Sequence, residues 1–304
     1  MARKRKKKES LVYQVQKTLE AKLAIGDSKA NDKSMETLRL REKKKYNPKA
    51  TLSYEERITI HKIYSWKTFH DYQHNCCAFV KWCKGNYNCR TLEECRPYAN
   101  EWLASYSNYS AYTQKAYACA IAKLYSCTLM DLAPTPIRHR ADITRSRTAA
   151  QRDKNFNAEN HKEFIEFCKG TGLRKSELEC LRGDQLLYRN GQYYIAVTRG
   201  AKGGRYREAP IISNVEDIVA RIKNAGDNKV WDYVPDLDVH SLRSEYCCEI
   251  YKKHAHPLED IPKKERYICR GDLKGVIYDK KAMLIASQCL GHNRISVIAG
   301  HYLR

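Results

Sequence analysis

The stretch LGHNRISVIAGHYLR spans residues 290–304 and contains His292 and, ten positions later, Tyr302. A phenol has a pKa of about 10, so a tyrosine that acts as a nucleophile needs cationic groups and hydrogen-bond donors around its target. Tyrosine is abundant here, with 22 among 304 residues, and most tyrosines are simply packed or solvated. The stretch therefore becomes informative only through the segments that precede it.

Three cationic segments precede it in a fixed order: TGLRKSELECLR at 171–182, RGAKGGRYR at 199–207 and HSLR at 240–243. The candidate catalytic residues that they contribute are Arg174, Lys202, His240 and Arg243. With His292 and Tyr302 they make a set of cationic and hydrogen-bonding side chains that suits phosphoryl transfer. The set holds no pair of carboxylates to bind Mg²⁺, so we expect no metal and no other cofactor.

This ordered set resembles the tyrosine recombinases, the phage-integrase family of enzymes that cut and exchange DNA strands. The resemblance implies a mainly α-helical chain with a small β-hairpin or sheet. A helical core-binding domain and a mixed α/β catalytic domain would form a C-shaped DNA clamp. The resemblance also implies that Lys202 protonates the departing 5′-oxygen and that Tyr302 forms a 3′-phosphotyrosyl link, which a second 5′-hydroxyl can reverse without ATP.

The charge that develops during the reaction suggests roles for the other residues. Attack on a phosphodiester places negative charge on two non-bridging oxygens, which Arg174 and Arg243 can bind by charge-assisted hydrogen bonds. His240 and His292 add donors and can help to take the phenolic proton. Glu177 lies three residues after Arg174 on the same side of a predicted helix, so it can hold that guanidinium in place.

The composition indicates a strongly anionic partner. The net charge of +21 at pH 7 favours nucleic acid, and the resemblance specifies double-stranded DNA. No run of 18 apolar residues occurs and no apolar stretch follows the basic start, so we expect neither membrane insertion nor secretion. Thirteen cysteines without regular CxxC pairs then indicate reduced thiols and a cytoplasmic location. The resemblance implies a bacterial or phage-derived context.

The length predicts two main domains with basic segments beside them. Residues 1–49 hold 16 Lys or Arg against 6 Asp or Glu and indicate a basic N-terminal arm with a short helix. Residues 50–133 are expected to form the helical core DNA-binding domain, 134–155 a basic linker and 156–304 the catalytic domain. The predicted DNA contacts of the linker and the hairpin are Arg138, Arg140, Arg145, Arg147, Arg199 and Arg205. A nuclear localisation signal is the alternative for the arm, but nothing else in the sequence supports it.

Helical spacing runs through the first half of the chain. Ser10 is a candidate N-cap for a helix that ends near Gly26, and the charged stretch 38–50 indicates a linker or a solvated helix. Thr91 with Glu94 three residues later predicts a capping box. Further helices are expected at 65–85, 91–105 and 110–126.

A zinc site is the alternative for this half. Four cysteines recur every six residues and two histidines lie one helical turn apart: Cys77, Cys83, Cys89, Cys95, His70 and His74. Six-residue spacing does not gather ligands on one helix face, and the closely spaced pairs typical of structural zinc are absent. We therefore expect buried free cysteines.

The second half alternates helices with one hairpin. A helix at 159–170 is expected to bury Phe164, Ile165 and Cys168. The packing face of the segment that carries Arg174 is expected to be Leu173, Leu178 and Leu181. Residues 192–211 alternate as a hairpin whose turn runs from Gly200 to Gly204, and the spacing of HSLR places its histidine and arginine on one helix face.

Two features depart from the family's pattern. The segment between Arg243 and His292 is about twice the usual length, and residues 254–275 look inserted. Tyr302 also lies one residue farther from His292 than is typical, so a strict count would place His301 at the position of the nucleophile. A histidine there would not support the chemistry, and we therefore assign the role to Tyr302.

We expect a site-specific recombinase or integrase of a mobile element, a phage or a transposon. The family implies a homotetramer on two DNA sites, with room for accessory proteins that bend DNA or set direction. Two alternatives remain: a topoisomerase- or resolvase-like strand transferase of the same chemistry, and a DNA-binding regulator without catalysis.

Overall fold

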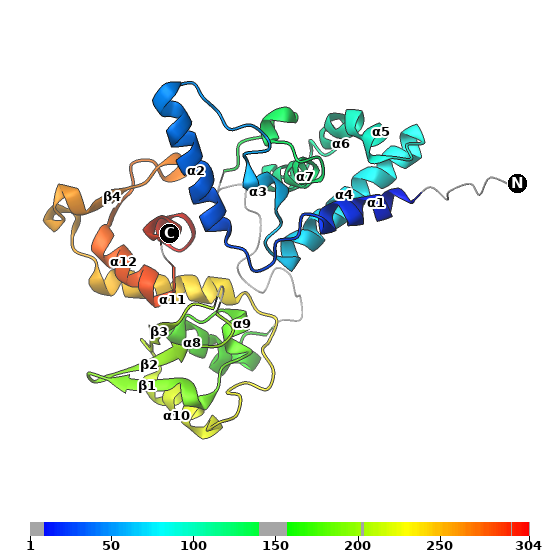
Figure 1. Cartoon of the computed structure of the whole chain (residues 1–304). Coiled ribbons are helices and arrows are strands. Elements are labelled where there is room, and N and C mark those ends of the chain that lie inside the picture. The colour runs from blue at the N-terminus through cyan, green and yellow to red at the C-terminus, as the bar shows by residue number, and fades with distance from the viewer. Residues whose placement is uncertain (1–8, 140–156, 202–203, 293, 304) are drawn as a thin grey trace, which may run out of the picture. The chain divides into compact units, whose positions relative to one another are not determined.

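The computed structural model describes residues 9–139, 157–201, 204–292 and 294–303. The chain divides into two compact units, Met1–Asp142 and Ile143–Arg304. Helices predominate in both units, and the described strands lie in the second unit (Figure 1). Each unit buries its own hydrophobic core.

Helix α1 (Leu11–Glu20) opens the described part of the first unit. The hydroxyl of Ser10 accepts a hydrogen bond from a backbone N–H of the first turn, as predicted for an N-cap. The helix ends before Gly26 and packs on α4 (Trp66–Tyr87). Its buried residues are Leu11, Val15 and Leu19. The helix predicted within the basic arm therefore belongs to the core of the first unit.

Helix α2 (Lys29–Tyr46) is the solvated helix allowed for by the charged stretch. All of its residues are described, and none of them is buried. Charged side chains tie it to the rest of the unit. Among them, Glu36 accepts hydrogen bonds from the backbone N–H of Thr59 (2.6 Å) and from its hydroxyl (3.2 Å), and Asp32 accepts one from the Tyr64 hydroxyl (2.8 Å). Thr59 lies in the short helix α3 (Ile58–His61).

The remaining helices of this unit follow the predicted order with shifted ends. Helix α4 continues past Gly85 to Tyr87, and Asn88 ends it in the left-handed conformation with φ 52°. The hydroxyl of Thr91 accepts from the N–H of Glu94, but the Glu94 carboxylate accepts from Arg90, so the capping box is half formed. The helix expected at 91–105 is divided into α5 (Leu92–Cys95), the 3₁₀ turn η1 (Arg96–Tyr98) and α6 (Ala99–Ala104).

Helix α7 (Ala111–Leu124) and the turn η2 (Leu129–Asp131) complete the unit, and the cysteines of the alternative zinc site lie in its core. Cys83, Cys89 and Cys95 are buried and Cys77 is half-buried, all as free thiols. Among the described residues, no three His, Cys, Asp or Glu side chains are grouped as metal ligands would be. Burial of three of these four thiols agrees with the predicted role as small apolar side chains.

The second unit begins with a core of helices against a sheet. Leu173, Leu178 and Leu181 are buried, as predicted, but Phe167 rather than Ile165 joins Phe164 and Cys168 in the core. The helical elements are η5 (Glu159–His161), α8 (Lys162–Thr171), α9 (Lys175–Leu178), η6 (Gly183–Gln185) and α10 (Val215–Ala225).

The sheet of this core is antiparallel with the order β1-β2-β3. Its strands are β1 (Leu186–Arg189), β2 (Gln192–Val197) and β3 (Arg207–Pro210). Pairing of Val197 with Arg207 confirms the hairpin around residues 200–204. The sequence analysis missed β1, although Asn190 and Gly191, with φ of 49° and 77°, form the kind of two-residue turn that Asn-Gly predicts.

Helix α11 (Val239–His254) separates the two cores of the second unit. It packs on α8 on one side and on α12 (Lys280–Cys289) on the other, and α13 (Ile295–His301) packs on α12 (Figure 1). HSLR lies at the start of α11, so the predicted helix is confirmed.

The inserted segment forms a small ordered structure between α11 and α12. Two short strands, β4 (Arg266–Ile268) and β5 (Ile277–Asp279), pair with each other, and 3₁₀ turns flank them: η7 (Leu258–Asp260), η8 (Lys263–Glu265) and η9 (Gly271–Leu273). Asp279, 1% exposed, accepts hydrogen bonds from the first N–H groups of α12 and from His256. This carboxylate therefore ties the insertion to the helix that precedes His292. Of the helices described in either unit, none is long and apolar enough to span a membrane.

Candidate active site

The hydroxyl of Tyr302 lies among the predicted cationic residues. Tyr302 follows α13 directly and is 3% exposed, whereas His301 before it is exposed. The Tyr302 hydroxyl is 3.0 Å from Nε2 of His292, and Arg243 Nε donates a hydrogen bond to it at 3.4 Å. The ring of His240 lies 5.2 Å from the Tyr302 ring, centroid to centroid.

Arg243 is held by backbone carbonyls from two distant segments. It is 1% exposed, and its two terminal nitrogens donate to the carbonyl oxygens of Gly172 and Leu290. Burial lowers its pKa to about 10, with a smaller contribution from the charges of nearby arginines, so it remains a cation at neutral pH. A guanidinium carries five N–H donors, which leaves Arg243 with two for an anion.

Arg174 approaches the same carbonyl from another side. Its Nη2 donates to Leu290 O at 3.2 Å, and its Nη1 donates to Glu177 Oε1 at 2.6 Å. The backbone N–H of Arg174 also donates to Glu177 Oε2, at 2.8 Å. The predicted contact between Arg174 and Glu177 is therefore present, and the Arg174 side chain keeps 22% of its surface exposed.

The sequence analysis missed a third arginine, Arg207. Its Nη1 and Nη2 each donate to one oxygen of Glu177 at 2.6 Å, and it is 7% exposed. One signal could have revealed it, because Arg207, Ala209 and Ile211 alternate along one face of the hairpin. The latter two are apolar and buried, so the arginine on that face needs an internal partner.

Glu177 is charged in spite of its burial. Its side chain is 1% exposed. Burial alone would raise the pKa of Glu177, but the hydrogen bonds and charge of Arg207 and the N–H of Arg174 lower it to about 2. The carboxylate is thus an anion at any pH near neutrality.

His292 is half-buried, and its backbone is fixed by Ser287. The N–H of His292 donates to Ser287 O at 2.8 Å, and the Ser287 hydroxyl donates to His292 O at 3.0 Å. Burial lowers the pKa of His292 to about 4, and the charges of Arg243, Arg174 and Arg207 act in the same direction. Its imidazole is therefore neutral at neutral pH, and in the tautomer with an unprotonated Nε2 that nitrogen can accept a hydrogen bond from the phenol.

The remaining predicted residues are Lys202 and the six proposed DNA contacts. Lys202, Arg140, Arg145 and Arg147 lie outside the described residues. Arg199 is paired with Asp184 through two hydrogen bonds of 3.1 and 3.2 Å, Arg205 is exposed, and Arg138 lies 5.4 Å from the ring centre of Tyr112. Of the described residues of the second unit, neither Arg199 nor Arg205 has a hydrogen bond or ion pair with the cluster around Tyr302.

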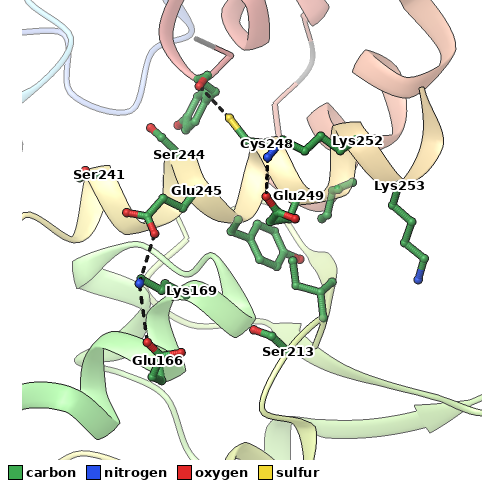
Figure 2. Close-up of a pocket in the computed structure, with 14 residues that line it drawn as sticks. Glu166, Lys169, Ser213, Ser241, Ser244, Glu245, Cys248, Glu249, Lys252 and Lys253 are labelled. Carbon is green, nitrogen blue, oxygen red and sulfur yellow. Dashed lines mark hydrogen bonds and ion pairs between the residues drawn. The ribbon is translucent and has the colours of Figure 1, made fainter. Parts of the chain in front are cut away.

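A cavity of about 590 Å³ adjoins Tyr302 on the side of α8 and α11 (Figure 2). Two of its three lysines are paired with carboxylates: Lys169 lies between Glu166 and Glu245, and Lys252 pairs with Glu249. Cys248 Sγ donates to the backbone oxygen of Tyr302 at 3.4 Å. Because its charges are largely balanced, the cavity suits a phosphate less well than the cluster of arginines.

No protein-family model matches the sequence, and no curated protein matches it. Among solved structures, the chain is similar to the XerH site-specific recombinase bound to palindromic difH substrate in a post-cleavage complex, with TM-score 0.51, 15% identity and coverage of 98% of this chain and 95% of that one. XerH in a pre-cleavage complex gives TM-score 0.47, 14% identity and coverage of 98% and 96%. The Tn1549 transposon integrase in complex with transposon right end DNA gives 0.43, 14% and coverage of 89% and 95%.

The first of these similarities shows the fold. The similarity to this XerH structure extends over nearly the whole of both chains and confirms the predicted fold class, mainly α with a small β-sheet. At 15% identity the similarity establishes nothing about activity.

The neutral state of His292 leads to a pH-dependent prediction. Its folded pKa of about 4 lies below the ordinary 6.5, so the unfolded chain binds a proton there first and the free energy of unfolding falls as the pH drops from 6.5 towards 4. His292→Asn should make this fall shallower. NMR titration of the imidazole, assigned by its absence in the variant, should give an apparent pKa near 4. A midpoint between 6 and 7 would contradict the described environment.

Proposed function

We propose that the protein is a site-specific tyrosine recombinase, an integrase of a mobile element, that cuts and rejoins double-stranded DNA. The observation that carries the proposal is the Tyr302 hydroxyl, which contacts a neutral imidazole at 3.0 Å and a buried guanidinium at 3.4 Å. Arg174 reaches the same carbonyl, Leu290 O, as that guanidinium. A nucleophile, a proton acceptor and two cations thus converge where a phosphodiester could bind.

The phosphate would be bound by the guanidinium N–H groups that make no hydrogen bond within the protein. Arg243 has two such N–H groups, and Arg174 has three once its bonds to Glu177 and Leu290 are made. The bonds to protein atoms would hold both guanidinium groups in place before DNA arrives. They would therefore stabilise the charge that develops on the non-bridging oxygens without a large reorganisation.

The first chemical step would transfer the DNA strand to the protein. The Tyr302 oxygen attacks phosphorus, its proton passes to Nε2 of His292, and the bond from phosphorus to the 5′-oxygen breaks. Lys202 would give a proton to that oxygen, and His240 would add a donor to the phosphate. Attack by a 5′-hydroxyl on the phosphotyrosyl link, with the protons moving back, would rejoin a strand.

Metal ions have no part in this proposal. The buried carboxylate nearest to the cluster, Glu177, already accepts four hydrogen bonds from Arg174 and Arg207. It would have to give up these contacts to bind Mg²⁺. We infer that side chains of the protein compensate the charge of the phosphate without a metal ion.

The charge of the chain supports DNA as the partner. The net charge is +21, and the linker and the loop of the hairpin carry the arginines named as DNA contacts. The two units would close on the duplex as a clamp, and four protomers would assemble on two sites, with accessory proteins where direction must be set. A cytoplasmic location fits these partners.

Replacement of Tyr302 by phenylalanine tests the proposal. DNA duplexes that bind the protein are first selected from a random pool. They are then resynthesised as a series in which a nick is moved across the site one nucleotide at a time. Cleavage close to the nick releases a short fragment that diffuses away, so the strand cannot be rejoined and the covalent adduct is trapped. In EDTA, wild-type protein should form an adduct that survives SDS, whereas Tyr302→Phe should bind the same DNA with no adduct.

His301→Ala is the matched control, since it alters the neighbouring residue, and it should retain the adduct. An adduct in Tyr302→Phe would move the nucleophile elsewhere. Cleavage that requires added Mg²⁺ would contradict the metal-free mechanism, and binding without any adduct would leave a DNA-binding regulator. Adducts that reseal but never exchange strands between two duplexes would favour the topoisomerase- or resolvase-like alternative.

Lys202 is tested by changing the leaving group. An alkoxide needs a proton to depart at neutral pH, whereas a thiolate, whose conjugate acid has a pKa near 8.5, hardly does. Lys202→Ala should therefore form the adduct about 100-fold more slowly on normal DNA and regain most of the rate on a 5′-phosphorothiolate substrate. Arg174→Ala is the comparison and should be rescued much less. Equal rescue would show that Lys202 only binds charge, and Arg199 or Arg205 would be tested next.

A further inference from the structure

Glu177 accepts hydrogen bonds from two arginines, which bind it in different ways. Arg207 occupies both carboxylate oxygens in a fork of two 2.6 Å hydrogen bonds, while Arg174 makes one side-chain bond and one backbone bond. An ionised carboxylate offers about four acceptor positions, so all of them are taken. Arg174 therefore cannot form a fork of its own with Glu177 while Arg207 is in place.

Arg207 also fixes the end of α12, close to Tyr302. Its Nε donates to Cys289 O at 3.0 Å, next to the Leu290 carbonyl that accepts from Arg174 and Arg243. Gly291 follows with φ 66°, and a Cβ there would meet the Arg207 side chain. A side chain at Gly291 would thus be excluded both by the left-handed backbone and by Arg207.

The charge balance of this group depends on Arg207. Two guanidinium groups and one carboxylate leave one positive charge, which the exposed edge of Arg174 can present to an anion. Without Arg207, the pair formed by Arg174 and Glu177 would be neutral. A buried carboxylate that loses its strongest partner would also draw Arg174 into the vacant positions, because an unpaired buried charge is strongly unfavourable.

We propose that Arg207 is a positioning residue, which occupies both oxygens of Glu177 so that Arg174 makes only one side-chain bond to that carboxylate and keeps its other donors for the scissile phosphate. The inference rests on the proposed function. Its distinctive consequence concerns Glu177. Without Arg207, the carboxylate would pair fully with Arg174 and so prevent that arginine from binding the phosphate. A residue that merely stabilised the fold would have no such consequence.

The test is a double-mutant cycle measured as the rate of adduct formation on the nicked duplex. Arg207→Met should slow the adduct by about 100-fold, the size of effect seen when one preorganised donor is lost, with DNA affinity within about twofold. Arg207→Met/Glu177→Gln should recover at least about tenfold of that loss, because an uncharged amide cannot neutralise Arg174. Arg189→Met is the matched control. Arg189 lies on β1, its side chain is exposed, and it pairs with Glu208, the residue that follows Arg207 on β3. It should react at about the wild-type rate.

Stability is followed in parallel by thermal unfolding. If Arg207→Met does not fold, Arg207→Lys and Arg207→Lys/Glu177→Gln replace the pair, because lysine keeps a charge but cannot form the fork. The same rescue is expected.

A double variant as slow as the single one, or slower, would overturn the inference, and so would a wild-type rate in Arg207→Met. In both cases the proposed function still stands if the wild-type protein forms the adduct. If the wild-type protein forms no adduct, the proposed function fails and the role given to Arg207 fails with it.

Discussion

A buried carboxylate organises this site. Glu177 is 1% exposed at its side chain, and an unpaired charge there would be strongly unfavourable. Four hydrogen bonds from Arg174 and Arg207 compensate for its burial and lower its pKa to about 2. Because these partners come from the start of α9 and from β3, the carboxylate can be satisfied only when helix and sheet are packed in one register. Folding and assembly of the site are therefore coupled.

A single carbonyl extends this constraint to the nucleophile. Leu290 O accepts from Arg174 and from Arg243, and Arg243 in turn donates to the Tyr302 hydroxyl. Two residues after that carbonyl, His292 reaches the same hydroxyl. The end of α12 thus places the arginines, the histidine and the tyrosine relative to one another, and the inserted segment 254–275 supports it from the far end through Asp279.

Local patterns predicted the elements better than the contacts between them. Capping at Ser10, the hairpin and the position of HSLR on a helix followed from the sequence, because each depends on neighbouring residues. Phe167 was missed because periodicity alone does not define which edge of a helical stripe meets the core. Arg207 was missed because its partner lies 30 residues away, and only the fold brings the two together. The roles of all the site residues stay predictions, and for Lys202 and the linker arginines other than Arg138 the position is a prediction too, since those residues lie outside the described structure.

The most direct measurement identifies the atom that carries the DNA. The adduct formed on the nicked duplex is digested with protease and nuclease, and mass spectrometry locates the nucleotide on the peptide that spans Ile295–Arg304. The account predicts a nucleotide joined through its 3′-phosphate to the oxygen of Tyr302, with a free 5′-hydroxyl on the released strand. A nucleotide on His301 or another residue, or a 5′-phosphate link to Tyr302, would contradict it.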